Sequence, residues 1–245
     1  MLKLIKELKP FVIPILLIIV LLFLQAATEL ALPDYMSDIV NVGIQQSGIE
    51  KTVPKVMKAD TMSKVKMFVS EDERSLIDNS YKLINSGNLT ENEYKNLLKK
   101  YPALKSESLY ILNTDSKEDM EKLDSCLGNA LFIVKNMEER VRGNTFNANE
   151  INLNETNVLK SQADGMIKAI PESIVKQSAI EYIKSQYEDI GIDIGKVQTN
   201  YILYVGGIML LISLTGMAAT ISVGFISARI SSAFGRNLRD KILIR

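Results

Sequence analysis

Two uncharged stretches decide the fold of this chain: PFVIPILLIIVLLFLQAAT at residues 10–28 and VQTNYILYVGGIMLLISLTGMAATISVGFISA at residues 197–228. The first has 19 residues and the second has 32. A helix needs about 20 apolar residues to cross roughly 30 Å of hydrocarbon. We therefore predict two membrane helices, at residues 10–32 and 197–228. A run as long as the second is not typical of a core helix in a soluble protein.

The first stretch also shares the basic start and apolar middle of a signal peptide. Its uncharged run exceeds the usual length of about 7 to 15 residues, and Gln25, Ala26 and Ala27 form only a weak cleavage context. We therefore expect a retained helix rather than a cleaved leader.

Basic residues flank both stretches and predict the orientation. Lysines precede the first stretch, and arginines and lysines follow the second: Lys3, Lys6, Lys9, Arg229, Arg236, Arg239, Lys241 and Arg245. Because cationic residues near membrane helices stay in the cytoplasm, residues 1–9 and 229–245 should be cytosolic. Residues 33–196 should then lie outside, although loops of this length translocate largely regardless of their own charge.

Composition limits the chemistry of this insert. The chain has no histidine and one cysteine, Cys126, so histidine metal sites and intrachain disulfides are excluded. About 160 residues can bury a core without disulfides, and we expect Cys126 to be a small buried side chain. The charges sum to zero, and we predict no nucleic-acid partner.

The insert has a helical pattern, which makes the predicted fold an all-α membrane protein with a mainly helical extracytoplasmic domain. Thr90 and Glu93 have capping-box spacing, and Pro102 should end that helix. A second helix should start near Ser116 and bury Met120, Leu123, Leu127, Leu131 and Val134. The polar stretch at residues 144–157 should be an exposed loop.

A third helix of the insert should lead toward the second membrane helix. Its apolar stripe consists of Ile174, Ala179, Ile180, Ile183, Tyr187 and Ile190. Pro171 suits the start of this helix, and Gly191 and Gly195 should interrupt the path to the membrane.

No catalytic constellation is visible. Acidic runs at residues 71–73 and 118–121 are typical of solvated helix starts, and no calcium-loop spacing or phosphate-binding loop accompanies them. We therefore predict no enzymatic activity, catalytic residue, metal or cofactor for these residues.

Two polar residues stand out in the first membrane helix. Gln25 and Glu29 are one turn apart and should share a face. They are the candidates for a translocation path, while the alternative is that Glu29 reaches water at the membrane edge.

The second membrane helix should continue into the cytosol. Apolar residues recur at four-residue spacing through a segment rich in arginine and lysine: Ile226, Ile230, Phe234, Leu238 and Ile242. Such a stripe needs partner helices, as do the small residues Gly206, Gly207, Gly216 and Gly224. We expect these partners in a longer protein of which this chain is a truncated part.

Three segments resemble the first two membrane helices and first intracellular loop of bacterial ATP-binding cassette exporters. They are ALPDYMSDIVNVGI at 31–44, YILYVGGIMLLISLTGM at 201–217 and ARISSAFGRNLRDKI at 228–242. The last is the most specific, because the family pattern Phe-Gly-Arg-x-Leu-Arg-x-Lys matches residues 234–241. The likeness is to multidrug-type half-transporters of Gram-positive anaerobes, and it does not extend to residues 50–170.

The resemblance implies a role for the chain. The complete protein would have further membrane helices, a nucleotide-binding domain using ATP and Mg²⁺, and a second half-transporter, commonly as a heterodimer in the bacterial cell membrane. These 245 residues would contribute part of the export channel, with Phe234, Arg236, Leu238 and Arg239 on the coupling helix. The alternative for the two arginines is anchoring at the membrane edge.

Two other classes share this layout. A two-pass sensor or chemoreceptor would also place a ligand-binding domain between two membrane helices. Its signalling linker usually begins with a proline after the second helix, whereas ISARISSAFGRNLRDKI continues without one. An outer binding domain that is merely anchored would need no cytosolic continuation.

Overall fold

The computed structural model describes residues 11–85, 87, 89–143, 165 and 170–243. The chain divides into two compact units. One consists of Met1–Asn41 with Tyr201–Arg245, and we call it the helical-pair unit. The other, Val42–Asn200, is the insert unit. The predicted loop at residues 144–157 lies outside the described residues.

Two long helices dominate the helical-pair unit. Helix α2 spans Val12–Asp38 and passes through Pro33, beyond the end predicted at residue 32. A proline removes one main-chain hydrogen bond but is tolerated in membrane helices. The π-helix η2, Ile39–Gln45, follows directly. Helix α9 spans Ile194–Leu243 and has 50 residues, which corresponds to about 75 Å. By length and composition both apolar helices are able to cross a membrane.

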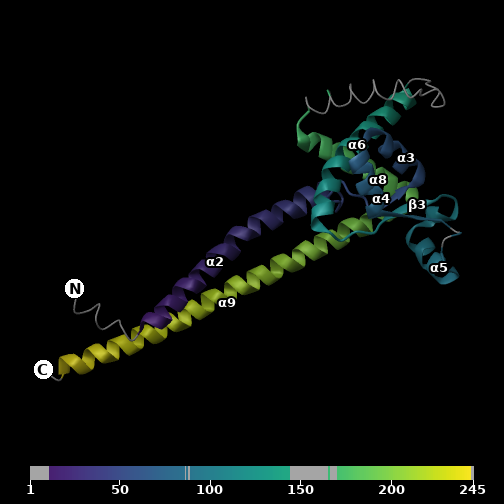
Figure 1. Cartoon of the computed structure of the whole chain (residues 1–245). Helices are drawn as coiled ribbons and strands as arrows, with labels where there is room; N and C mark the ends of the chain where they lie inside the picture. The colour runs from purple at the N-terminus through teal and green to yellow at the C-terminus, as the bar shows by residue number, and fades with distance from the viewer. Residues whose placement is uncertain (1–10, 86, 88, 144–164, 166–169, 244–245) are drawn as a thin grey trace. The chain divides into compact units, whose positions relative to one another are not determined.

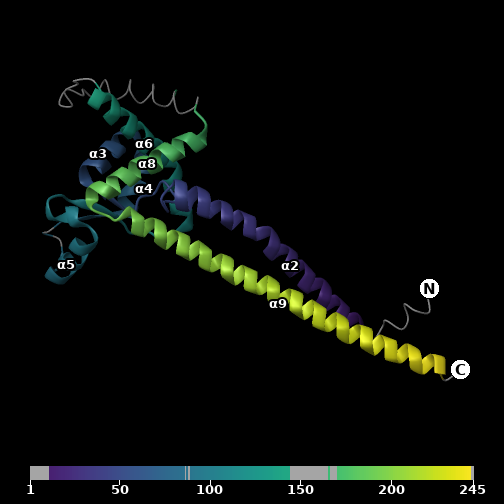
Figure 2. The ribbon, with the colours of Figure 1, turned by 180° about the vertical axis from the view of Figure 1, so that it is seen from behind.

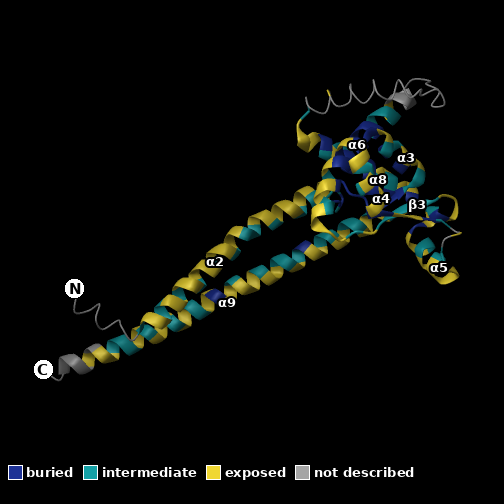
Figure 3. Ribbon diagram, viewed as in Figure 1, coloured by how far each residue is buried: buried dark blue, intermediate teal, exposed yellow. Residues whose placement is uncertain are grey.

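The apolar side chains of these helices are largely exposed (Figure 3). Helix α2 contains no buried residue, and Phe23 and Leu30 are 75% and 76% exposed. In α9, Val205 and Ala219 are buried, but Leu203 is 68% exposed. A soluble fold would bury side chains of this kind, so this surface favours an apolar surrounding such as lipid.

The two helices of this unit approach each other closely at Gly216. A Cβ atom added there would lie 2.7 Å from Oγ1 of Thr28 on α2. The expected packing role therefore holds for Gly216. At Gly206, Gly207 and Gly224 an added Cβ would meet nothing within 4 Å, so these positions are open in this chain.

The insert unit contains a small sheet that the sequence pattern did not predict. Strands β1 (Val56–Lys58), β2 (Tyr81–Ile84) and β3 (Leu109–Leu112) form an antiparallel sheet with β3 in the middle. The all-α prediction is therefore too simple for this unit. Strands of three or four residues are too short to show a clear period of two in the sequence.

Five helices and a 3-10 turn complete the described part of the insert unit. They are α3 (Ala59–Phe68), α4 (Glu71–Ser80), α5 (Glu91–Lys100), η3 (Pro102–Lys105), α6 (Lys117–Gly143) and α8 (Glu172–Ile190). Helices α6 and α8 lie side by side and make the most extensive helix contact of the unit (Figures 1 and 2). The three predicted helices of the insert correspond to α5, α6 and α8.

The core of the insert unit lies between these helices and the sheet. Its fully buried side chains include Met57, Met62, Ile77, Leu109, Leu123, Leu127, Leu131, Ile183 and Ile190. The predicted stripe on α6 is confirmed, with Met120 partly buried at the edge. On α8 the stripe is confirmed except at Ile174, which is 51% exposed.

Helix α8 ends at a glycine that no other residue can easily replace. Gly191 has φ +87°, in the left-handed region, and its N–H donates to the carbonyl of Glu188 at 3.0 Å. A Cβ atom added there would lie 2.9 Å from Cγ of Pro102. Gly195 is different, because it lies inside α9. The prediction that Gly195 interrupts the path to the membrane is therefore wrong. Gly195 is the second residue of α9, and a glycine so near a helix start destabilises the helix little.

Candidate functional site

Gln25 and Glu29 share one face of α2, as the sequence predicts. Nε2 of Gln25 donates a hydrogen bond to Oε1 of Glu29 at 2.9 Å. Glu29 is exposed, and no ion pair to it occurs within the described part of the chain. A carboxylate on an otherwise apolar helix is costly in lipid and is a functional candidate by default. Its part in a translocation path stays a prediction.

The predicted coupling segment is an unbroken continuation of α9. The helix passes through Phe234, Arg236, Leu238 and Arg239 and ends at Leu243. The side chains of Arg236 and Arg239 are exposed, whereas Phe234 is half-buried. The side chain of Leu238 lies outside the described set.

The acidic runs of the insert unit begin helices, as expected. At the start of α4, the N–H of Ser70 donates to Oε2 of Glu73 at 2.7 Å. At the start of α6, Glu118 pairs with Lys122 at 2.7 Å. Within the described ranges, no three acidic or cysteine side chains gather as a metal ion would require.

The segment that follows the first long helix is held by side chains from three elements, and we call residues 52–55 the tethered segment. The backbone N–H of Thr52 donates to Oδ1 of Asp124 on α6 at 2.5 Å. The Thr52 hydroxyl contacts the same carboxylate oxygen at 2.8 Å. Lys176 on α8 lies 3.5 Å from the other oxygen. Thr52 is only 1% exposed, so these bonds satisfy a buried polar residue.

Two tyrosines complete this attachment. The hydroxyl of Tyr81 donates to the carbonyl of Pro54 at 2.8 Å. The hydroxyl of Tyr187 on α8 accepts a hydrogen bond from the N–H of Lys55 at 2.7 Å. Burial raises the pKa of Tyr81 well above its ordinary value and that of Tyr187 to about 12. Both phenols therefore stay neutral and act as structural hydrogen-bond partners.

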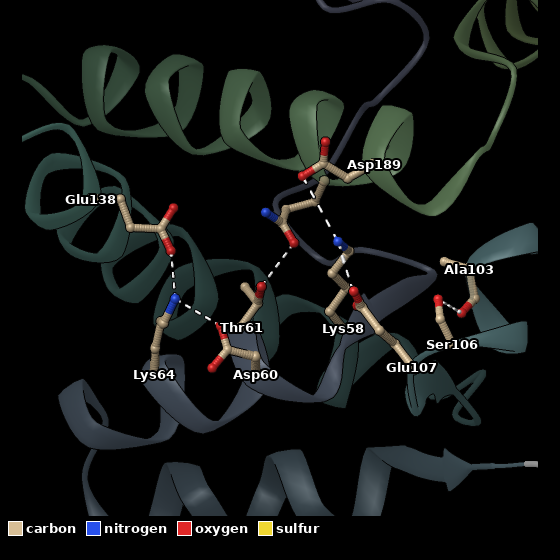
Figure 4. Close-up of polar contacts among 10 residues, drawn as sticks. Lys58, Asp60, Thr61, Lys64, Ala103, Ser106, Glu107, Glu138 and Asp189 are labelled. Atoms are coloured by element: carbon tan, nitrogen blue, oxygen red, sulfur yellow. Dashed lines mark hydrogen bonds and ion pairs between the residues drawn. The ribbon is translucent and has the colours of Figure 1, made fainter. Parts of the chain in front are cut away.

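Charged side chains link α3 to its neighbours (Figure 4). Lys64 lies 2.8 Å from Asp60 and 2.9 Å from Glu138 of α6. Burial lowers the pKa of Lys64, but its hydrogen bonds to these carboxylates outweigh that effect and leave the pKa raised. Lys58, which directly precedes α3, pairs with Glu107 at 3.4 Å and lies 4.0 Å from Asp189 of α8. Such partly exposed pairs fix geometry and contribute little stability.

Cys126 is buried, which confirms the expected role. It is 6% exposed, and its Sγ lies 3.6 Å from the carbonyl oxygen of Leu123. Burial raises the pKa of this thiol to about 12, so the thiolate needed for nucleophilic chemistry is not formed near neutral pH.

Sequence reasoning missed the tethered segment. Its contacts join residues that are far apart in the chain, such as Thr52 with Asp124 and Lys55 with Tyr187. No local period or spacing links such residues. The only signal available was a polar residue, Asp124, beside the apolar stripe of the predicted α6 helix.

Comparison with protein-family models, with curated proteins and with solved structures found no match. Function is therefore inferred from the residues and their geometry.

Proposed function

We propose that this chain is the first part of the membrane domain of an ATP-binding cassette exporter of the multidrug type. Helices α2 and α9 would be its first two membrane helices, and the insert unit would lie outside the cell. ATP hydrolysis would take place in a nucleotide-binding domain beyond these residues, with ATP and Mg²⁺ bound there. A second half-transporter would complete the channel.

The continuity of α9 is the observation that supports this proposal best. At about 75 Å the helix exceeds the roughly 30 Å of hydrocarbon by about 45 Å. Its final part contains the segment that resembles the exporter family, ARISSAFGRNLRDKI. A helix that leaves the membrane without a break can transmit a displacement, because its backbone hydrogen bonds resist bending.

The side chains near the end of α9 suit a coupling role. Ile226, Ile230 and Phe234 follow one another at four-residue spacing and are all half-buried. Arg236 and Arg239 are exposed and free to contact a partner domain. In the proposed mechanism, ATP-driven closure of the nucleotide-binding domains moves this segment, and α9 passes the movement to the membrane.

The hydrogen-bonded pair of Gln25 and Glu29 is the proposed contribution of α2 to the translocation path. Glu29 offers carboxyl oxygens and Gln25 offers an amide on the same helical face. A path lined in this way would favour cationic or hydrogen-bonding substrates.

The proposal is tested in the protein encoded by the complete reading frame, with Cys126→Ala as background and Gln25→Cys as reporter. ATP with vanadate should change the rate at which a membrane-impermeant maleimide labels this cysteine. Leu238→Pro should abolish that change while ATP binding persists, because proline breaks the helix at a cost of about 3 kcal/mol. Leu238→Ala, which keeps the helix, is the matched control.

Two outcomes would contradict the proposal. If labelling of the Gln25→Cys protein that keeps Leu238 does not respond to ATP, the proposed ATP-driven path at Gln25 is contradicted, and the two-pass sensor becomes the better account. If Leu238→Pro assembles, binds ATP and responds normally, α9 is not the coupling element.

A further inference from the structure

The insert unit contains a cavity of about 410 Å³ beside helix α8. One wall comes from Gln45 and Gln46, at the end of η2, and the other from α8. The polar residues of the α8 wall are Gln177, Ser178, Glu181 and Lys184. Gln177, Glu181 and Lys184 follow one another at spacings of four and three residues, so they occupy one face of the helix. The volume lies within the range of about 300–1,000 Å³ that small-molecule sites occupy.

A strained turn holds the Gln46 wall in place. Ser47 has φ +54°, an uncommon left-handed conformation for a residue with a side chain, and it is buried. Gly48 continues the turn with φ +79°, and its N–H donates to the carbonyl of Val42 at 2.8 Å. π-helical turns and strained backbone both occur frequently at functional sites.

One buried acceptor in this wall has no donor. Oε1 of Gln46 is buried and accepts no hydrogen bond from the described residues. Leaving such an atom unpaired is costly, and native structures contain few of them. Gln46 lines the cavity, and a rotation of its amide group would bring Oε1 within reach of an N–H group of a ligand there.

The charges of the opposite wall are separated along α8. Oε2 of Glu181 accepts a hydrogen bond from Lys135, which leaves its other oxygen for a further donor. Lys184 takes part in no ion pair or hydrogen bond within the described part of the chain. The cavity therefore presents acceptors at Gln46 and Glu181 and an uncommitted cation at Lys184. Ile174 and Ile180 add apolar surface.

We propose that this cavity binds a zwitterionic ligand of the size of an amino acid or a dipeptide. The ammonium group would donate to Oε1 of Gln46 and to Glu181, and the carboxylate would pair with Lys184. An apolar side chain would lie against Ile174 and Ile180. This inference does not depend on the proposed exporter function, since it uses only contacts within the insert unit.

The test uses the whole chain in lipid nanodiscs and isothermal titration calorimetry. Free amino acids and dipeptides are titrated one at a time. The best binder is compared with its decarboxylated amine and its deaminated acid, which for leucine are 3-methylbutylamine and 4-methylpentanoate. We expect saturable binding of the zwitterion, and affinities at least about tenfold weaker for the two single-charge analogues, the factor for a lost charge-assisted hydrogen bond.

Two variants test whether these residues form the binding site, and a third serves as a control. Lys184→Gln and Gln46→Leu should each weaken binding of the zwitterion by about tenfold or more. Lys99→Gln removes an exposed lysine from α5 and should leave binding unchanged. The circular dichroism spectrum and melting temperature of each variant without ligand verify that it is folded.

The proposal is overturned if no amino acid or dipeptide binds saturably. It is also overturned if folded Lys184→Gln binds like the wild type, or if either single-charge analogue binds as tightly as the zwitterion. In the latter case the cavity does not recognise the charge pair.

Discussion

The two units use the same apolar residue types in opposite ways. In the insert unit Leu127 is 0% exposed, whereas Leu210 on α9 is 64% exposed. Burying a leucine contributes about 1.5–3 kcal/mol, so the insert unit gains its folding free energy from its own core. The apolar side chains of the helical pair are not buried within that unit. They gain this free energy of burial only in lipid or against further helices. The difference teaches that apolar content predicts burial only once the surrounding medium is known.

The largest expected effect is a direct test of this contrast. Leu127→Ala should lower the free energy of unfolding of the insert unit by about 2–5 kcal/mol, because it leaves a cavity in a closed core. The same change at the exposed Leu210 should alter it by less than about 0.5 kcal/mol. Native-state hydrogen exchange of α6 amides, measured on the whole chain in nanodiscs, reports this free energy. Equal effects at the two positions would remove the distinction between the units.

The sequence predicts this contrast well, because both signals are local. The uncharged runs identify α2 and α9, and the spacing of Leu123, Leu127 and Leu131 identifies the buried face of α6. What the sequence does not predict depends on contacts between distant residues. The central strand β3 pairs with β1 and β2, which both lie more than twenty residues before it in the chain. The cavity beside α8 likewise depends on Gln46 and Lys184, which are far apart in the chain, lining the same space, and no sequence period reveals this.

A smaller effect on stability is expected when a glycine is replaced by alanine, and each unit offers one such position. Gly191→Ala should destabilise the insert unit by about 1–2 kcal/mol, because alanine is strained at positive φ and its Cβ would also meet Pro102. Gly235→Ala, in α9, has open space around it and should be neutral or stabilise the helix by up to about 1 kcal/mol. Hydrogen exchange measures the first effect and helical content the second. A stable Gly191→Ala variant would show that α8 does not need this ending.

The smallest effect concerns the exposed cap of α5. Thr90 donates to Glu93 through its hydroxyl at 2.6 Å and its N–H at 3.0 Å, and these bonds lower the pKa of the Glu93 carboxyl below 4.5. A lowered folded-state pKa means that the cap contributes at pH values above about 4.5 and is lost as pH falls through the folded value. In Thr90→Ala the pKa measured by NMR should return toward 4.5. An unchanged pKa would exclude the Thr90 hydroxyl as a contributor.

The central proposal is that α2 and α9 span a membrane, with residues 33–196 outside the cell and the end of α9 in the cytosol. Cysteines are introduced one at a time in a Cys126→Ala background, at exposed Lys99 in α5 and at exposed Ser232 in α9. A membrane-impermeant maleimide should label Lys99→Cys on intact cells and Ser232→Cys only after permeabilisation. Reversed labelling, or labelling of both sites on intact cells, would contradict the account.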